Sequence, residues 1–162
     1  MITVMKNIVS FILPITVLII VPLWIESDWT IHFGLSLICG LLLIALGLVV
    51  MGLTISSFIR IGKGTLAPWS PTEKLVIKGL YRYVRNPMIM GVLTVLVGES
   101  VLVRSENILT WAGTFFLINT FYFIVYEEPS LEKRFGDEYR AYKKHVGRWI
   151  PRNSAYEPSK SN

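Results

Sequence analysis

Two short polar segments contain the residues best suited to bind a charged ligand. Arg82 and Arg85 lie just before one long apolar run, and the paired acids Glu127 and Glu128 lie just after the next. Arginine recognises carboxylates, and an acidic side chain can bind an ammonium group. If the two runs form antiparallel helices, both segments meet at one end and would suit a zwitterionic ligand. In the simpler interpretation, these charges only pair with one another at a membrane boundary.

The composition indicates which elements must position these charges. The chain has 162 residues, of which 52% are hydrophobic and only 17% charged, whereas soluble domains carry about 25% charged residues. The charges lie between long apolar runs and near the C-terminus, a pattern typical of a chain embedded in lipid. We therefore predict an all-α integral membrane protein with a single domain over residues 1–152.

Four apolar runs predict about four transmembrane helices, at residues 8–25, 31–59, 88–103 and 108–125. With both termini in the cytoplasm, every Lys and Arg except Arg104 lies on the cytoplasmic side, as the positive-inside rule requires. In a bacterium this would be the cell membrane. The net charge of +5 is explained in the same way, so we predict no nucleic-acid partner. The glycine-rich second run would permit a dimer.

The segment after the fourth run has a helical pattern of apolar residues. They recur at spacings of three and four and predict one or two amphipathic helices at the membrane surface: Leu131, Phe135, Tyr139, Tyr142 and Val146. From residue 153 to 162 we expect a disordered tail. The single cysteine excludes a disulfide within the chain, and the two histidines are too far apart in sequence to suggest a metal site, so none is predicted.

Two motifs resemble those of the isoprenylcysteine carboxyl methyltransferase and phospholipid methyltransferase family. Residues 79–88, with the sequence GLYRYVRNPM, and Gly91 are similar to the family pattern G-x-Y-x-x-x-R-H-P-x-Y-x-G. One helical hairpin later, residues 127–142 match its E-E-x-x-L-x-x-x-F-G-x-x-Y-x-x-Y pattern. Asn86 replaces the family histidine and Ile89 the tyrosine. Asparagine can hydrogen-bond but cannot exchange a proton near neutral pH.

The resemblance implies methyl transfer from S-adenosylmethionine (SAM) to a lipid-like or membrane-embedded acceptor, similar to an isoprenylcysteine carboxylate or a phospholipid amine. It places the cofactor site in segments 62–91 and 126–151, and Arg85, Asn86 and Glu128 would be catalytic. An amine acceptor must lose a proton, which a carboxylate such as Glu128 could help to remove.

The resemblance also implies a set of cofactor-binding residues. Glu127 and Glu128 would bind the ammonium group or the ribose hydroxyls, while Arg85 and Asn86 would orient the carboxylate or the pocket's backbone. The remaining members would contact the adenine or sulfonium, leave room for cofactor entry, or close the pocket: Tyr81, Tyr83 and Tyr126; Gly91 and Gly98; and Arg148.

Two other functions agree with parts of the sequence. A membrane reductase related to sterol reductases has a somewhat similar C-terminal region and would bind NADPH, although this chain is short for its ten or so spans. A non-catalytic membrane scaffold with a decayed site is slightly favoured by Asn86 and Ile89, whereas the retained paired acids and arginines argue against it. The acceptor atom, whether carboxyl oxygen, amine nitrogen or thiol sulfur, is not specified by the sequence.

Overall fold

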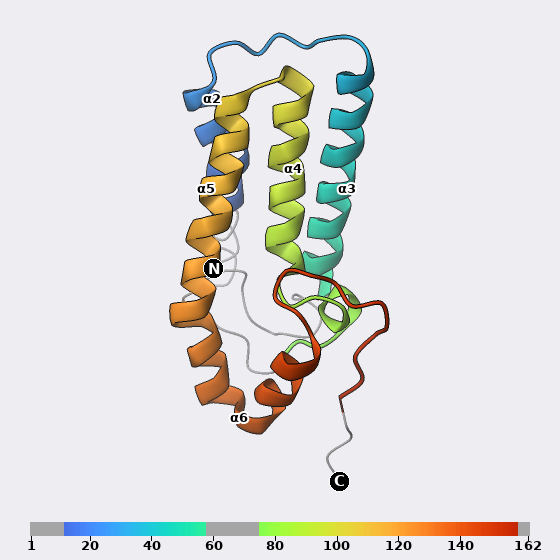
Figure 1. Ribbon diagram of the computed structural model, residues 1–162, viewed down its shortest axis with the longest axis vertical. Helices are drawn as coiled ribbons and strands as arrows, with labels where there is room; N and C mark the ends of the chain where they lie inside the picture. The colour runs from blue at the N-terminus through green and yellow to red at the C-terminus, as the bar shows by residue number, and fades with distance from the viewer. Residues whose placement is uncertain (1–11, 58–74, 159–162) are drawn as a thin grey trace, which may run out of the picture.

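The computed structural model describes residues 12–57 and 75–158, and the regular structure within these two ranges is helical throughout (Figure 1). Some predicted features therefore lie outside the described residues. These are the start of the first span (8–11), the end of the second (58–59), part of the first cofactor-site segment (62–74) and the last residues of the tail (159–162).

Three long helices stand side by side, with the N-terminal helix behind them, and the chain after α5 folds below the bundle (Figure 1). An apolar helix covers Ile12–Ile25. In chain order, the elements are η1 (Thr16–Ile20), α2 (Val21–Ile25), α3 (Leu35–Ser57), η3 (Gly79–Arg82), α4 (Pro87–Val103), α5 (Glu106–Tyr122), η4 (Phe123–Glu127) and α6 (Glu128–His145).

Each of the four predicted spans contains a helix, but the helices differ in length. Two helical stretches are long and apolar enough to cross a membrane, namely α3 and the continuous stretch Glu106–His145. The helix Ile12–Ile25 and α4 are shorter apolar helices. The structure therefore supports a helical membrane protein, with two candidate spans by length and composition, and the count of four stays a prediction.

Local chemistry explains several helix boundaries. α3 begins at Leu35 rather than near Ile31, because Gly34 has a φ of +126°, which no helix accommodates. α4 starts with Pro87, whose fixed φ suits a first helical turn. Ser105 caps α5, since its Oγ accepts a hydrogen bond from the Ile108 amide at 3.1 Å.

Both π-helical turns precede a proline. η1 lies before Pro22, and η4 lies before Pro129. A proline inside a helix lacks an amide donor and clashes with the carbonyl four residues earlier. A wider turn relieves that clash, so the helix that begins with α5 continues past Val125. The sequence had predicted that the fourth span would end there. As a result, α5, η4 and α6 form one continuous path from the bundle to Glu127 and Glu128 (Figure 1).

Glycines on facing surfaces bring α3 and α4 into backbone contact. A Cβ atom added at Gly47 would lie 2.6 Å from the Gly91 carbonyl oxygen, and one at Gly98 would lie 2.9 Å from the Gly40 carbonyl oxygen. Small residues permit such close approach between membrane helices. We call Gly40, Gly47, Gly91 and Gly98 the glycine seam. Two glycines of the second apolar run, Gly40 and Gly47, thus serve packing against α4.

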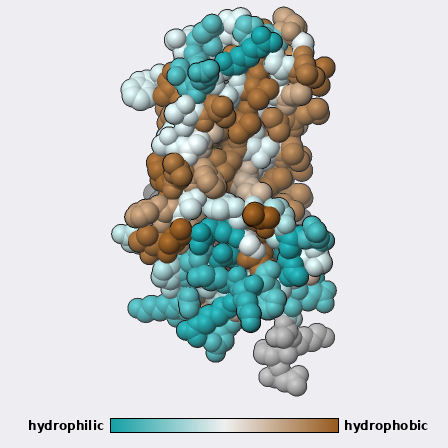
Figure 2. Space-filling view, in the orientation of Figure 1, coloured by the Kyte–Doolittle hydropathy of each residue, from teal (hydrophilic) through white to brown (hydrophobic). Residues whose placement is uncertain are grey.

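Most of the outer surface of the bundle is apolar. Figure 2 shows hydrophobic residues over the middle of the molecule and hydrophilic residues gathered towards both ends. Large side chains are exposed along the outer helices; for example, Leu42 on α3 is 65% exposed and Leu117 on α5 is 67% exposed. Contiguous apolar surface of this kind is unfavourable in water and is expected against lipid tails.

The amphipathic C-terminal segment uses its apolar face within the protein. Tyr139, Tyr142 and Val146 are buried together with Ile77, and Leu131 and Phe135 pack against them. The predicted apolar face is therefore confirmed. It packs against the segment before α4 and against other residues of the C-terminal segment. The helix also bends at Gly136, where φ is +52° and ψ is −127°, so that its second half folds back.

The prediction of a disordered tail from residue 153 is wrong for residues 153–158. The Tyr156 amide donates to the Arg82 carbonyl at 3.0 Å, and the Tyr156 ring lies 5.9 Å from that of Tyr142. Glu157 forms an ion pair with Arg82 at 2.9 Å. The polar composition suggested disorder, but these contacts fasten the tail across the segment that leads into α4.

Candidate functional site

The segment before α4 is held by the C-terminal part of the chain. The Arg85 amide donates to the Gly147 carbonyl at 2.9 Å, and the Arg152 amide donates to the Tyr83 carbonyl at 3.0 Å. The Tyr142 hydroxyl donates to the Tyr81 carbonyl at 2.6 Å. These bonds join segments about sixty residues apart in sequence and thereby fix the two family motifs against one another.

Glu128 is the centre of a buried ionic cluster. Only 4% of its surface is exposed, although the residue begins the polar α6. Its Oε1 lies 3.0 Å from Arg85 Nη1 and 2.5 Å from Arg148 Nε, and its Oε2 lies 3.1 Å from Lys143 Nζ. The expectation that Arg85 and Glu128 meet at one end of an antiparallel pair is thus confirmed. We call these four residues the Glu128 cluster.

The cations around Glu128 determine its protonation state. Burial alone acts to raise the pKa of this carboxyl group, but the hydrogen bond from Arg148 and those from its other cationic partners outweigh burial and lower the pKa. Glu128 is therefore a carboxylate whose oxygens are already engaged. Such a group orients Arg85 and Arg148, and it is poorly suited to accept a proton.

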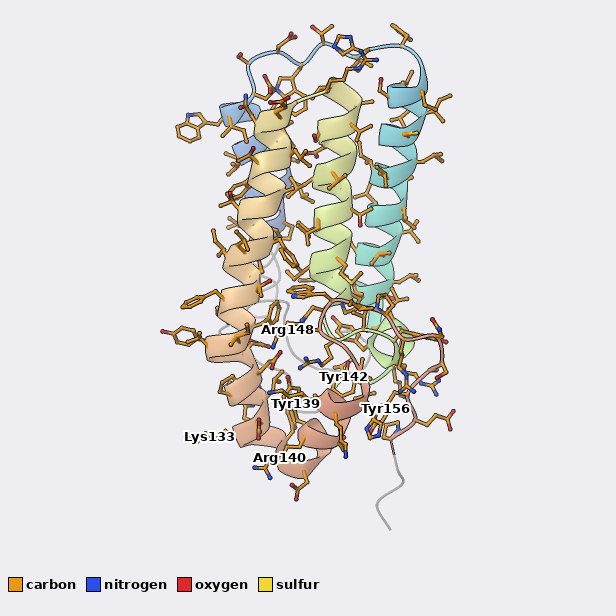
Figure 3. The ribbon with its side chains drawn as sticks, viewed as in Figure 1. Lys133, Tyr139, Arg140, Tyr142, Arg148 and Tyr156 are labelled. Atoms are coloured by element: carbon orange, nitrogen blue, oxygen red, sulfur yellow. The ribbon has the colours of Figure 1, made fainter. Side chains whose placement is uncertain are left out.

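Tyr139 joins the same cluster from the bent helix. Its hydroxyl accepts a hydrogen bond from Arg85 Nη1 at 3.1 Å, and its ring is almost completely buried. Figure 3 shows Tyr139 and Tyr142 on α6 below the bundle, with Arg148 between them and the ends of the long helices. The cluster therefore lies where the apolar bundle meets the polar end of the molecule.

Glu127 has a different environment from its neighbour. Its Oε2 lies 3.5 Å from the Tyr122 hydroxyl, at the long limit of a hydrogen bond. Burial raises the pKa of Glu127, and the Tyr122 hydrogen bond and the charge of Arg134 offset this only in part. Adjacent acids at the end of the apolar stretch 108–125 thus differ: one is fully paired, and the other retains the capacity to bind a cation or a proton.

Arg82 and Asn86 do not bind the paired acids. Arg82 donates from Nε to the Tyr156 carbonyl at 2.8 Å, in addition to its ion pair with Glu157. The Asn86 amide nitrogen lies 3.5 Å from the Arg148 carbonyl oxygen. Asn86 thus contacts the turn that carries Arg148. The expectation that Arg82 faces Glu127 or Glu128 is wrong, because Arg82 pairs with Tyr156 and Glu157 of the ordered tail.

The three predicted tyrosines are in different places. Tyr81 is buried, and burial raises the pKa of its hydroxyl. Tyr83 is 37% exposed, and Tyr126 is 65% exposed with its ring stacked on that of Tyr122 at 6.0 Å. Within the described ranges, the side chains of Tyr83 and Tyr126 form no hydrogen bond with the Glu128 cluster, so the structure does not gather these tyrosines into one aromatic wall.

Gly91 and Gly98, predicted to leave room for cofactor entry, pack against α3. Both belong to the glycine seam, where α3 fills the space beside them. A Cβ atom at Gly91 would lie 2.8 Å from Met51 Cγ, and one at Gly98 would lie 2.8 Å from Ile44 Cγ1. Their small size serves helix packing, and the sequence did not reveal which neighbour would occupy that space.

Three residues at this end of the molecule were missed as site residues. Lys143 reaches Glu128 because the bend at Gly136 turns the helix back. Tyr139 was assigned to packing, although its place in the second motif was a usable signal. Trp149 follows Arg148 directly and packs between two rings of the α5–η4 path, with centroid distances of 5.2 Å to Phe116 and 5.8 Å to Phe123.

Two buried donors at this end have no hydrogen-bond partner among residues 12–57 and 75–158, namely Arg85 Nε and Trp149 Nε1. Buried polar groups are normally paired, so each exception requires an explanation. Together with Glu127, which is only weakly bonded, they provide donors and an acceptor for a ligand that carries both signs of charge. The residues present therefore fit a zwitterionic cofactor such as SAM.

Comparison with known proteins agrees with this arrangement. The sequence pattern described as phospholipid methyltransferase matches residues 35–138, from the start of α3 to within α6. A stretch of 46 residues is 48% identical to an uncharacterized protein of Haemophilus influenzae, which corresponds to 27% of this chain and 73% of that protein. No solved structure matches the chain. Because the family pattern covers well over half of the sequence, the chain belongs to the phospholipid methyltransferase family, a family of methyltransferases that act on lipid-like substrates.

Proposed function

We propose that this protein transfers a methyl group from SAM to a lipid-like acceptor at the cytoplasmic face of a membrane. The observation that carries the proposal is the Glu128 cluster, in which both family motifs meet at the boundary between the apolar bundle and the polar end. The basic residues of this end support a cytoplasmic orientation, with the four helices crossing the membrane and both termini inside.

The cofactor would be bound by residues from both motifs. Arg85, held in place by Glu128 and Tyr139, retains Nε as a donor for a carboxylate. Glu127 would bind the ammonium group, because its carboxylate has only one weak hydrogen bond from a side chain. When bound, SAM supplies a methyl group on a positively charged sulfonium, which is already an activated electrophile.

The chain's own residues then have two tasks. They must align the acceptor with the methyl group, and they must exclude water from it. Asn86 and the Arg148 turn would fix the relative position of the motifs, since they contact one another and since Arg148 binds Glu128. An acceptor with an apolar tail would arrive from the lipid along the exposed apolar surface of α5.

The structure changes the residue that we propose as proton acceptor. Glu128 was the first candidate, but its lowered pKa and its three cationic partners make it a weak base. The pKa of Glu127 is raised by burial, which makes this carboxylate the better acceptor if the nucleophile is an amine. A carboxylate nucleophile would need no base.

A transfer assay tests this proposal. Membranes containing the protein are incubated with SAM labelled in its methyl group, and label is measured in the lipid extract. The wild type should label a lipid, whereas Glu127→Gln should lower the rate by about 10²-fold or more if an amine is methylated. Glu132→Gln is the matched control, because Glu132 is a partly exposed acid on α6 that pairs with Arg140 at 2.9 Å and lies 4.0 Å from Lys143. No label in any extract from folded wild-type protein would contradict the proposal.

A further inference from the structure

Trp149 occupies an unusual position between the ionic and the apolar parts of the site. Its backbone follows Arg148, whose guanidinium binds Glu128. Its ring contacts Phe116 on α5 and Phe123 on η4. Trp149 therefore connects the C-terminal segment to the α5–η4 path at the level of the Glu128 cluster.

The indole nitrogen of Trp149 is buried and donates no hydrogen bond. An indole N–H can only donate, so it needs an acceptor whenever it is removed from water. Trp111 shows how the same fold treats a comparable ring, because its Nε1 donates to the Val17 carbonyl at 3.1 Å. Among the described residues, Trp149 therefore lacks the acceptor that Trp111 has.

Arg85 Nε is the other unpaired donor of this region, and it is connected closely to the same turn. The Arg85 amide bonds to Gly147, and Arg85 and Arg148 share Glu128 Oε1. Two guanidinium groups, those of Arg85 and Arg148, therefore face a single carboxylate oxygen. An excess of positive charge next to unpaired donors favours an anionic oxygen acceptor.

We infer that Trp149 is a ligand-binding residue whose indole N–H donates to an anionic oxygen of a bound ligand, next to Arg85. This inference rests on the proposed function and adds to it a residue that neither family motif contains. The oxygen belongs to a carboxylate or a phosphate. The carboxylate is that of the cofactor's amino-acid part, and the phosphate is that of a lipid headgroup.

Nuclear magnetic resonance of the indole groups tests the inference directly. The protein has five tryptophans, so labelling tryptophan with ¹⁵N gives a small set of indole signals, and Trp149→Phe identifies the signal of Trp149. S-adenosylhomocysteine and a short-chain phosphatidylglycerol are added in separate titrations. The Trp149 signal should move downfield with one of them, whereas the Trp111 signal should stay in place because its N–H is already bonded.

Calorimetry of the same variants provides the second measurement. Trp149→Phe keeps a ring against Phe116 and Phe123 and removes the N–H, so it should weaken binding of the ligand that moves the signal by about tenfold. Trp111→Phe, the matched control, should leave that affinity unchanged. A shift with S-adenosylhomocysteine supports a carboxylate partner, and a shift with the lipid alone supports a phosphate partner.

These measurements distinguish failure of the Trp149 inference from failure of the proposed function. If S-adenosylhomocysteine binds by calorimetry but neither ligand moves the Trp149 signal, the inference is overturned and the proposed function stands. If S-adenosylhomocysteine does not bind but the lipid moves the signal, Trp149 is a ligand-binding residue and the SAM proposal is wrong. If neither ligand binds the folded protein, both are overturned.

Discussion

The glycine seam along α4 and the Glu128 cluster next to its first residue are stabilised in opposite ways. In the seam, uncharged backbones of α3 and α4 touch, and a Cβ atom at Gly47 would lie 2.6 Å from a carbonyl oxygen. In the cluster, a nearly buried carboxylate binds three cations brought from separate segments. The seam depends on shape and should be indifferent to pH, whereas the cluster depends on charge. The cluster also contains a buried donor, Arg85 Nε, that has no partner among the described residues and that a ligand could use.

The largest expected effect is on the cluster. Glu128→Ala leaves Arg85 and Arg148 without their shared carboxylate, and removing one member of a buried ion pair costs about 3–5 kcal/mol. Glu132→Ala on the same helix breaks exposed ion pairs and should cost less than about 1 kcal/mol. Denaturant unfolding in mixed micelles measures both. Equal losses for the two variants would mean that the cluster does not stabilise this end.

The next largest effect is on the seam. Gly47→Ala places a methyl group against the Gly91 carbonyl and Val95, so the helices must separate, at a cost of about 1–3 kcal/mol. Gly52→Ala on the same helix meets nothing within 4 Å, and it should be neutral or slightly stabilising. The same unfolding measurement applies. If Gly47→Ala matched Gly52→Ala, the close contact between α3 and α4 would be refuted.

The dependence of stability on pH should separate the two regions. The pKa of Glu128 is lower in the folded protein than its ordinary value of 4.5, so its ion pairs contribute fully above that pH and are lost as the pH falls through the folded value. The stability difference between the wild type and Glu128→Ala should therefore shrink below about pH 4.5. The difference between the wild type and Gly47→Ala should not change with pH. If both stability differences shrank to the same extent as the pH fell, the contrast between the cluster and the seam would be contradicted.

The smallest effect is expected at Glu127 and has the opposite sign. Burial raises its pKa, so its charged form is disfavoured in the folded protein, and stability should increase as the pH falls through the raised value. Glu127→Gln should remove this dependence and modestly raise the free energy of unfolding at pH 7. Unfolding curves for this variant from pH 4 to 8 measure the effect. A loss of stability at pH 7 would show that Glu127 has a structural role.

The parts of the site that the sequence predicted are those fixed by chain direction. Arg85 and Glu128 flank an antiparallel hairpin of apolar runs, so their meeting follows from topology alone. The packing of Gly91 and Gly98 against α3 was not predicted, because spacing along one helix does not identify the helix that faces it. Lys143 was missed because its reach depends on the bend at Gly136, and the tail was missed because Tyr156 acts through contacts distant in sequence.

The most direct test of the polar end around Glu128 as a cofactor site is a calorimetric titration of the purified protein with S-adenosylhomocysteine. Our account predicts saturable binding that Glu127→Gln weakens by about 1.4 kcal/mol, or tenfold, and that Glu132→Gln leaves unchanged. NADPH, titrated in parallel, should give no saturable heat. Absence of S-adenosylhomocysteine binding by folded wild-type protein, or saturable binding of NADPH in its place, would contradict the account.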